Sequence, residues 1–391
     1  MLDERTIQFA IQHRQDDVHR LLLLASQYPD VDMPAAATQI EGWHAARTKI
    51  PSWAENDAVI WPSRLSMEQC SSEATARYKA TLVGGSTLAD LTGGLGVDCA
   101  FMSERFEKTI YVERNEQIFA ISSANFRSLA LSNIHPVCED ALRVLETLPL
   151  QDWLYLDPAR RSTSGRKVVA LDDCEPDVTA LEDKLLQHAS QVMIKCSPML
   201  DIHRACQQLR SVQSIHVVAL NGECKELLLI LGKTPKNPDE MGVFCINLPS
   251  DDSFFFTRKE EKEATCEFAS EPGLYLYEPN AAILKAGCFK LPAQRFGLKK
   301  LHPNTQLYTS DTLCKDFPGR SFRVVGAEKL SKDIRKSLLA GITQANLTTR
   351  NFPTSVDDLR KRLRLAEGGS HYLFATTTND NRHLLVLCTK A

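Results

Sequence analysis

The segment Thr87–Asp98 constrains the fold of this chain more than any other part of the sequence. It begins with a short apolar run, continues through a turn that contains three glycines, and ends in residues that favour a helix. This order predicts a strand, a tight turn and a helix N-terminus. Such a turn exposes backbone N–H groups at the carboxyl end of a strand, where an open α/β sheet holds a nucleotide-like ligand.

Two carboxylates flank the glycine turn. Asp90 precedes it and Asp98 follows it, although carboxylates repel the phosphate groups of NAD or ATP. They are better suited to a cofactor with a cationic or amino-acid portion. The sequence therefore predicts S-adenosylmethionine as the ligand rather than NAD or ATP.

Strand and helix patterns alternate from Thr87 to about Lys233, which predicts an α/β fold with a mostly parallel sheet. Because Asn221-Gly222 is a hairpin signal, we expect the last two strands to be antiparallel. Seven strands are expected, at Thr87–Leu91, Thr109–Val112, Ile134–Cys138, Trp153–Leu156, Gln191–Ile194, Ser214–Ala219 and Glu226–Leu231.

The sequence predicts four regions. Apolar stripes at helical spacing indicate an N-terminal helical region over residues 1–85, and the strand–helix alternation occupies 86–234. Proline-rich and charged segments over 235–272 indicate a linker. Short strands mixed with helices over 273–391 predict a small α+β domain, undivided or made of two subdomains.

Composition narrows the class of protein. The chain is 43% hydrophobic and 24% charged, which is typical of soluble globular proteins. It lacks an apolar run of the length, about 20 residues, that spans a bilayer, and its N-terminus lacks a signal-peptide pattern, so we expect a cytoplasmic protein without membrane contact. The 12 cysteines form no CxxC pair, so we expect no metal site.

The net charge of −3 conceals an asymmetry. Residues 271–391 contain 19 Lys and Arg against 10 Asp and Glu, whereas the rest of the chain contains 27 against 39. A basic region on an acidic body is typical of a nucleic-acid-binding appendage. The alternative is that surface lysines cluster there without a partner.

The chain resembles class I S-adenosylmethionine-dependent methyltransferases, in the branch that carries a C-terminal THUMP-like domain. Asp90, Gly94 and Gly96 match the glycine motif of this family, and Thr92 stands where many members have the first glycine. The resemblance implies a seven-stranded Rossmann-like methyltransferase sheet. The expected cofactor-binding residues are Asp90, Thr92, Gly94, Gly96, Asp98, Glu113, Asp140 and Asp157.

Carboxylates also follow the second and third expected strands. Glu113 lies at a strand end, 23 residues after Asp90, where a carboxylate can accept both ribose hydroxyls. A solvated loop acid is the alternative. Asp140 occupies the position where the family's acid meets the adenine amino group, and a helix N-cap is the alternative interpretation.

The segment Tyr155–Arg161 contains candidate catalytic residues. In the family, the acid at the position of Asp157 stands beside the methyl donor and is followed by two prolines and often an aromatic residue. Here Pro158 is followed by Ala159 and Arg160, which resembles the Asp-Pro-Pro-Arg of uridine C5-methyltransferases more than the motif of purine amino methyltransferases. A simple Asp-Pro turn is the alternative.

A candidate nucleophile follows the fifth strand. The segment Cys196-Ser197-Pro198 resembles the Cys-Asn-Pro of uridine C5-methyltransferases, in which the thiolate adds to the base. Lys195 would help to lower the pKa of this thiol. The alternative is a buried, unreactive cysteine.

Basic residues form two candidate substrate-binding sets. Arg160, Arg161 and Arg166 lie in a loop next to the expected methyl site, where they could hold phosphate. The THUMP-like resemblance implies an RNA substrate, with backbone contacts at Lys299, Lys300, Arg335 and Lys336. The prediction is a methyltransferase of tRNA or rRNA. A methyltransferase of a small molecule or protein, and a catalytically silent RNA-binding protein, are the alternatives.

Overall fold

The computed structural model describes residues 3–160, 171–250 and 252–391. The chain divides into two compact units. The N-terminal unit comprises Met1–Ile215 and Lys225–Lys236, and the C-terminal unit comprises His216–Cys224 and Asn237–Ala391. Among the described residues, no helix has the combination of length and apolar character that a membrane span requires.

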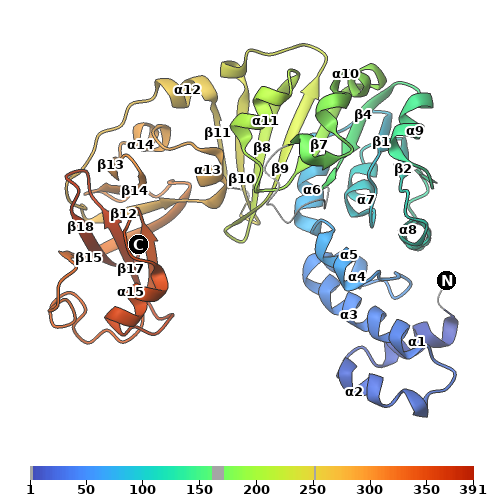
Figure 1. Cartoon of the computed structure of the whole chain (residues 1–391), viewed down its shortest axis with the longest axis horizontal. Helices are drawn as coiled ribbons and strands as arrows, with labels where there is room; N and C mark the ends of the chain where they lie inside the picture. Colours follow the sequence, from blue (N-terminus) through green and yellow to red (C-terminus); the bar gives the residue numbers. More distant parts are fainter. Residues whose placement is uncertain (1–2, 161–170, 251) are drawn as a thin grey trace. The chain divides into compact units, whose positions relative to one another are not determined.

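A mixed sheet has the strand order β11-β10-β8-β9-β7-β4-β1-β2-β3 (Figure 1). Neighbours from β7 through β4, β1 and β2 to β3 are parallel, whereas β9 is antiparallel to β7. The α/β class is therefore confirmed, and every predicted strand is present. The strands are β1 (Thr87–Asp90), β2 (Lys108–Val112), β3 (Ile134–Val137), β4 (Gln151–Leu156), β7 (Ala189–Cys196), β8 (Val212–Leu220), β9 (Glu223–Gly232), β10 (Gly242–Leu248) and β11 (Asp252–Thr257).

The expectation of seven strands is wrong, because the sheet has nine. The additional strands β10 and β11 pair antiparallel within the range 235–272, which the sequence indicated as a linker. Their apolar residues are flanked by the proline-rich segment that precedes β10 and by the charge run Arg258–Glu263. That run is helix α12, whose first turn is fixed by a capping box between Thr257 and Glu260.

Short helices precede the sheet and lie between its strands. Most begin at an aspartate, asparagine or serine whose side chain accepts a hydrogen bond from the first turn, as Asp32 does for α3 and Ser72 does for α6. The α-helices of this unit are α1 (Glu4–Gln12), α2 (Val18–Leu23), α3 (Met33–Lys49), α4 (Pro51–Ala54), α5 (Arg64–Gln69), α6 (Glu73–Leu82), α7 (Val97–Ser103), α8 (Glu116–Ser128), α9 (Ala141–Thr147), α10 (Val178–His188) and α11 (Ile202–Gln208).

One hydrophobic cluster joins the leading helices to the sheet. Trp53 and Trp61 share this buried cluster with Phe101, Tyr111 and Phe126 from α7, β2 and α8. The amide side chain of Asn125 reinforces the contact, because it accepts from the Ile60 N–H at 2.8 Å and donates to the Ile60 carbonyl at 2.9 Å. The leading helices are therefore part of the folded core of this unit.

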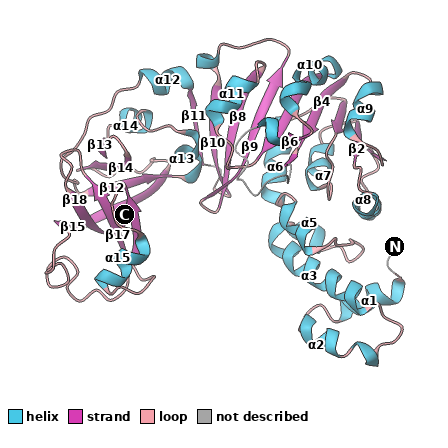
Figure 2. Ribbon diagram, viewed as in Figure 1, coloured by secondary structure: helices cyan, strands magenta, loops and turns pink. Residues whose placement is uncertain are grey.

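The C-terminal unit is rich in β-structure (Figure 2). A second sheet has the order β13-β14-β12-β15-β18-β17-β16, and its buried aromatic residues include Tyr277, Tyr308 and Phe322. The strands of this sheet and the helices between them are β12 (Tyr275–Pro279), α13 (Ala281–Ala286), α14 (Leu291–Phe296), β13 (Lys299–His302), β14 (Thr305–Ser310), β15 (Gly319–Lys329), β16 (Asn346–Arg350), α15 (Val356–Leu363), β17 (His371–Thr377) and β18 (His383–Lys390).

A buried histidine predicts an acid-sensitive step in stability. His216 stacks on Phe244 at 4.6 Å between ring centroids, and burial lowers its pKa to about 4. Because the unfolded chain binds this proton more readily, stability is lost as the pH falls from about 6.5 towards about 4. At pH 4 this loss amounts to about 3 kcal/mol.

Denaturant titrations of the wild type and of a His216→Gln variant at several pH values would measure this loss. The variant should lose less stability than the wild type between pH 7 and pH 4. The exposed His135→Gln variant should behave like the wild type. Equal acid sensitivity in all three proteins would contradict the assignment.

Candidate functional site

A cavity of about 1220 Å³ lies in the N-terminal unit, at the carboxyl ends of β1, β2, β4 and β7. The structure brings nine of the predicted residues to its wall, while the predicted Asp90 lies buried behind it. The nine are Thr92, Gly94, Gly96, Asp98, Glu113, Asp140, Asp157, Pro158 and Cys196.

The glycine turn packs directly against aromatic rings. A Cβ atom on Gly93 would lie 2.1 Å from Tyr111 Cε2, and one on Gly96 would lie 2.4 Å from Phe126 Cζ. Gly96 also has φ of 80°, which favours glycine, and it immediately precedes α7. The sequence did not single out Gly93, because its requirement comes from Tyr111 in the neighbouring strand.

Two carboxylates fix the shape of this turn. Asp90 accepts a hydrogen bond from Thr92 N at 3.0 Å, and Glu113 accepts from Gly94 N at 2.8 Å and from Asn115 N at 2.7 Å. Burial raises the pKa of Asp90 well above its usual value, with Asp98, Asp157 and Glu113 adding to the effect. A cationic ligand group would therefore stabilise the ionised form of Asp90 and offset the repulsion among these carboxylates. Carboxylate oxygens have further lone pairs, so Glu113 can still accept from a ligand.

Asp140 has two roles in the structure. Its side chain accepts from Leu142 N at 2.9 Å and caps α9, as the alternative interpretation expected. It also lines the cavity. Because the cap uses one carboxylate oxygen, Asp140 keeps acceptor capacity for a ligand amine.

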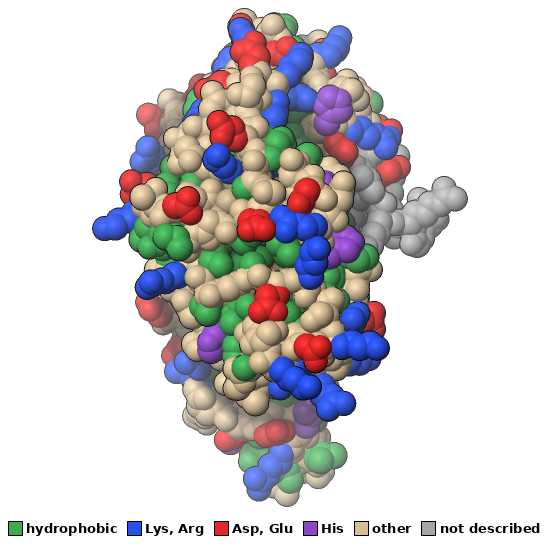
Figure 3. Space-filling model, turned by 90° about the vertical axis from the view of Figure 1, so that its left-hand side faces the viewer, with side chains coloured by type: hydrophobic (Ala, Val, Ile, Leu, Met, Phe, Trp, Pro, Cys, Tyr) green, Lys and Arg blue, Asp and Glu red, His purple; other side chains and the backbone are tan. Residues whose placement is uncertain are grey.

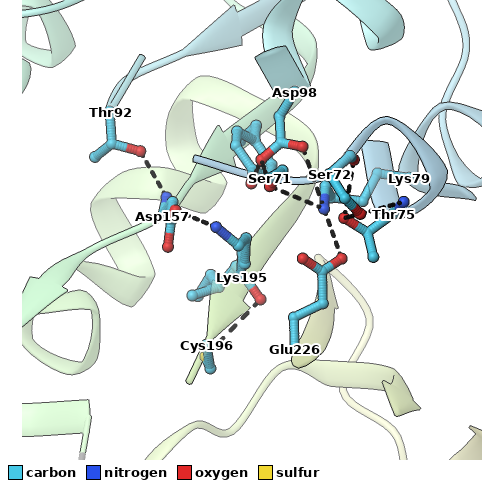
Figure 4. Close-up of polar contacts among 12 residues, drawn as sticks. Ser71, Ser72, Thr75, Lys79, Thr92, Asp98, Asp157, Lys195, Cys196 and Glu226 are labelled. Carbon is cyan, nitrogen blue, oxygen red and sulfur yellow. Dashed lines mark hydrogen bonds and ion pairs between the residues drawn. The ribbon is translucent and has the colours of Figure 1, made fainter. Parts of the chain in front are cut away.

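A network of buried charges reaches the cavity wall at Asp98. Its polar contacts are drawn in Figure 4. Lys79 is fully buried, and its Nζ lies 2.5 Å from Glu226 Oε1 and 3.2 Å from Asp98 Oδ1. The hydroxyls of Ser71 and Tyr155 both donate to Asp98 Oδ2 at 2.7 Å. Asp98 therefore serves mainly to hold the protein together at this point.

The pKa values in this network follow from burial and pairing. Burial alone would raise the pKa of Asp98, but the cations of Lys79 and Lys195 and the two hydroxyl donors hold it below its usual value. For Glu226 the effect of burial prevails, and its pKa is raised. Lys79 could not be identified from local sequence patterns, because 147 residues separate it from Glu226.

Asp157 is the exposed end of the charged network. Its carboxylate forms an ion pair with Lys195, and its backbone N–H donates to Thr92 Oγ1 at 2.5 Å. Burial would lower the pKa of Lys195, but Asp157, Asp98 and Glu226 together raise it above its usual value. Thr92 stands where many class I methyltransferases have a glycine. Its hydroxyl links the glycine turn to Asp157.

Cys196 lines the cavity but is only 7% exposed. Burial raises the pKa of its thiol well above the usual value, and the nearby Lys195 does not offset this effect. At neutral pH the thiol is therefore protonated. Its environment is that of an unreactive cysteine rather than of an activated nucleophile.

Thiol alkylation would test this conclusion. With iodoacetamide at pH 7.4, the exposed Cys138 should react rapidly, whereas Cys196 should react at least tenfold more slowly. Peptide mass spectrometry after timed quenching measures both rates. Denatured protein is the control, in which the two rates should converge, and equal rates in the folded protein would indicate an activated Cys196.

The structure describes five of the seven predicted basic residues. Arg161 and Arg166 lie outside the described residues, and the backbone of Arg160 forms the short strand β5 (Ala159–Arg160) with β6 (Cys174–Glu175). On the face in Figure 3, Lys and Arg side chains are interspersed with Asp and Glu.

The other four predicted basic residues belong to the C-terminal unit. Lys300 is buried and donates to the Pro303 carbonyl at 3.1 Å and to Gln306 Oε1 at 2.9 Å, so its ammonium is not on the surface. The Lys299 ammonium lies 3.0 Å from a carboxylate oxygen of Glu267, and Arg335 donates to the Ile342 carbonyl at 2.6 Å. The Lys336 ammonium lies 3.7 Å from a carboxylate oxygen of Asp333.

A glycine substitution would test the close packing of the turn. Gly93→Ala should lower stability by about 1–3 kcal/mol, since Tyr111 is held by its hydrogen bond to the Gly94 carbonyl and by edge contact with Phe126. Gly84→Ala is the matched control, because its Cβ would meet open space. Thermal unfolding of both variants measures the difference, and equal melting temperatures would refute the packing argument.

Comparisons with known proteins extend these observations. Residues 275–318 match the model of a ferredoxin-like domain, and residues 319–390 match the model of a THUMP domain-like family. The crystal structure of a protein from Porphyromonas gingivalis W83, provisionally assigned as a methyltransferase, shares 37% sequence identity with this chain. Its TM-score is 0.89, and the match covers 100% of both chains.

Two relatives come from Mycobacterium tuberculosis, strains CDC 1551 and H37Rv. Both are described as uncharacterized S-adenosylmethionine-dependent methyltransferases. Each is 24% identical over 314 residues, which is 76% of this chain and 79% of the relative.

Proposed function

The chain belongs to the family of S-adenosylmethionine-dependent methyltransferase-like proteins with a C-terminal THUMP-like domain, and we propose that it transfers a methyl group to RNA. The observation that carries this proposal is the cavity at the carboxyl ends of the parallel strands, which is lined by a glycine turn and by carboxylates. Open α/β sheets bind nucleotide-like cofactors at this edge. The carboxylates that line the cavity include those of Asp98, Glu113, Asp140 and Asp157.

The residues present fit S-adenosylmethionine. The glycine turn, which Asp90 supports from behind the cavity wall, would hold the methionine portion, whose amino group is cationic, while Glu113 would accept from the ribose and Asp140 from the adenine. When bound, the cofactor supplies an electrophilic methyl group on a sulfonium sulfur. Asp157 and Pro158 would position the methyl-accepting atom, and such positioning contributes much of the rate enhancement in a displacement reaction.

The RNA part of the proposal rests on the C-terminal region. Residues 319–390 match the THUMP domain-like family, and the resemblance implies binding of structured RNA such as tRNA or rRNA. The excess of Lys and Arg over residues 271–391 provides attraction to phosphate groups. Because several basic residues are paired locally, we expect this attraction to come from the net field rather than from one patch.

A labelling experiment tests the proposed function. The protein is incubated with S-adenosylmethionine labelled on the methyl group and with total RNA from cells that lack the protein. Label in one size class of RNA is expected. Label absent from RNA, despite measurable cofactor binding by calorimetry, would instead favour a small-molecule or protein substrate. Failure to bind the cofactor would favour a silent RNA-binding protein.

Substitution of Asp157 separates positioning from cofactor binding. Asp157→Ala should reduce methyl transfer by about 100-fold or more, while the Kd for S-adenosylhomocysteine changes by less than about tenfold. Glu146→Ala is the control, because this exposed carboxylate lies outside the cavity wall. Isothermal calorimetry and the labelling assay provide the two measurements, and parallel loss of both would refute the positioning role.

A further inference from the structure

Lys195 and Asp157 are brought together by strand register. Strands β4 and β7 are parallel neighbours in which Leu156 pairs with Ile194. Asp157 follows Leu156 and Lys195 follows Ile194, so both residues lie at the same edge of the sheet. The two side chains meet there as an ion pair, and both residues line the cavity. Figure 4 shows this pair beside Thr92.

The surroundings of Lys195 keep its ammonium in place. Its side chain is only 13% exposed, and the carboxylates of Asp157, Asp98 and Glu226 favour its charged form. The fully buried Lys79 holds Asp98 and Glu226 in turn. A fixed cation therefore stands at the point where Asp157 would meet a substrate.

This cation discriminates between classes of methyl-accepting atom. A nitrogen acceptor gains positive charge as its bond to the methyl carbon forms, and the ammonium of Lys195 would oppose that change. A hydroxyl oxygen gains negative charge as its proton departs, and a preorganised cation stabilises that charge. A carbon acceptor of the uridine C5 type requires a thiolate, whereas Cys196 is buried with a raised pKa.

We propose that this site methylates a hydroxyl oxygen, which in an RNA substrate is the ribose 2′-hydroxyl, and that Lys195 contacts this oxygen. The proposal rests on the proposed function, because it takes RNA as the substrate. Lys195 and Asp157 are then catalytic residues, and Lys79 is a positioning residue that acts through Asp98 and Glu226.

The reaction balances with the groups at hand. A lone pair of the hydroxyl oxygen forms the new bond to the methyl carbon, while the carbon–sulfur bond breaks and its electron pair goes to sulfur. The hydroxyl proton passes to the Asp157 carboxylate and then to solvent. Lys195 keeps its own proton throughout and stabilises the negative charge that develops on oxygen.

The position of the methyl group tests the proposal directly with the wild-type protein. RNA that has been methylated with labelled S-adenosylmethionine is hydrolysed completely with alkali, which requires a free 2′-hydroxyl. Label is expected in alkali-resistant dinucleotides. Label in mononucleotides that carry a methylated base would overturn the hydroxyl proposal and leave the RNA proposal intact. Absence of label from RNA would overturn both.

Substitution of Lys195 tests its part in the reaction. Lys195→Met should reduce kcat by about 100-fold or more, as loss of an oxyanion-stabilising donor does, and Lys195→Arg should restore part of the loss. Calorimetry with S-adenosylhomocysteine should give a Kd within about tenfold of the wild type for both variants. A Lys195→Met variant that keeps wild-type kcat would overturn the assignment.

A matched control is Lys184→Met, since Lys184 is partly exposed on α10 and lies outside the cavity wall. Its kcat and Kd should equal those of the wild type. If Lys195→Met fails to fold, the alkali test on the wild-type protein and the Lys195→Arg variant still decide the proposal.

Discussion

The buried ammonium of Lys79 is the interaction on which the site depends most. An unpaired charge inside a protein costs several kcal/mol, so Lys79 is tolerated only because Asp98 and Glu226 accompany it. These residues belong to α6, α7 and β9, and 147 residues separate Lys79 from Glu226. The ion cluster therefore links the leading helices, the glycine turn and the antiparallel strand into one wall of the cavity.

The cluster also determines the electrostatics of the cavity. Lys79 and Lys195 are outnumbered by the carboxylates of Asp90, Asp98, Asp157 and Glu226. Burial raises the pKa of two of these carboxylates, Asp90 and Glu226. A cationic ligand completes this balance, which is why the site suits a sulfonium cofactor with an amino-acid portion. Of the two lysines, only Lys195 lines the cavity, where its ammonium pairs with Asp157 on the proposed substrate side.

The sequence predicted the parts of this site that depend on local pattern. Glycines between a strand and a helix, and acids at the ends of successive strands, converge because parallel strands end at one edge of a sheet. Lys79 and Gly93 could not be identified in this way, since their requirements arise from Glu226 and Tyr111 after folding. Strands β10 and β11 were missed because prolines and charges surround their short apolar runs.

Counting basic residues in a sequence overestimates the contacts available to a nucleic acid. In the C-terminal unit, the buried carboxylate of Glu278 receives both Arg320 and Arg350, and Lys300 is enclosed by backbone and side-chain acceptors. These cations stabilise the fold of the unit. Their charge still contributes to the long-range field that attracts phosphate. The side chains of Arg320 and Arg350 remain 53% and 38% exposed, whereas the buried Lys300 is not accessible for a direct contact. The basic composition therefore indicates the sign of the partner, whereas the choice of the methylated atom has to come from the catalytic cavity.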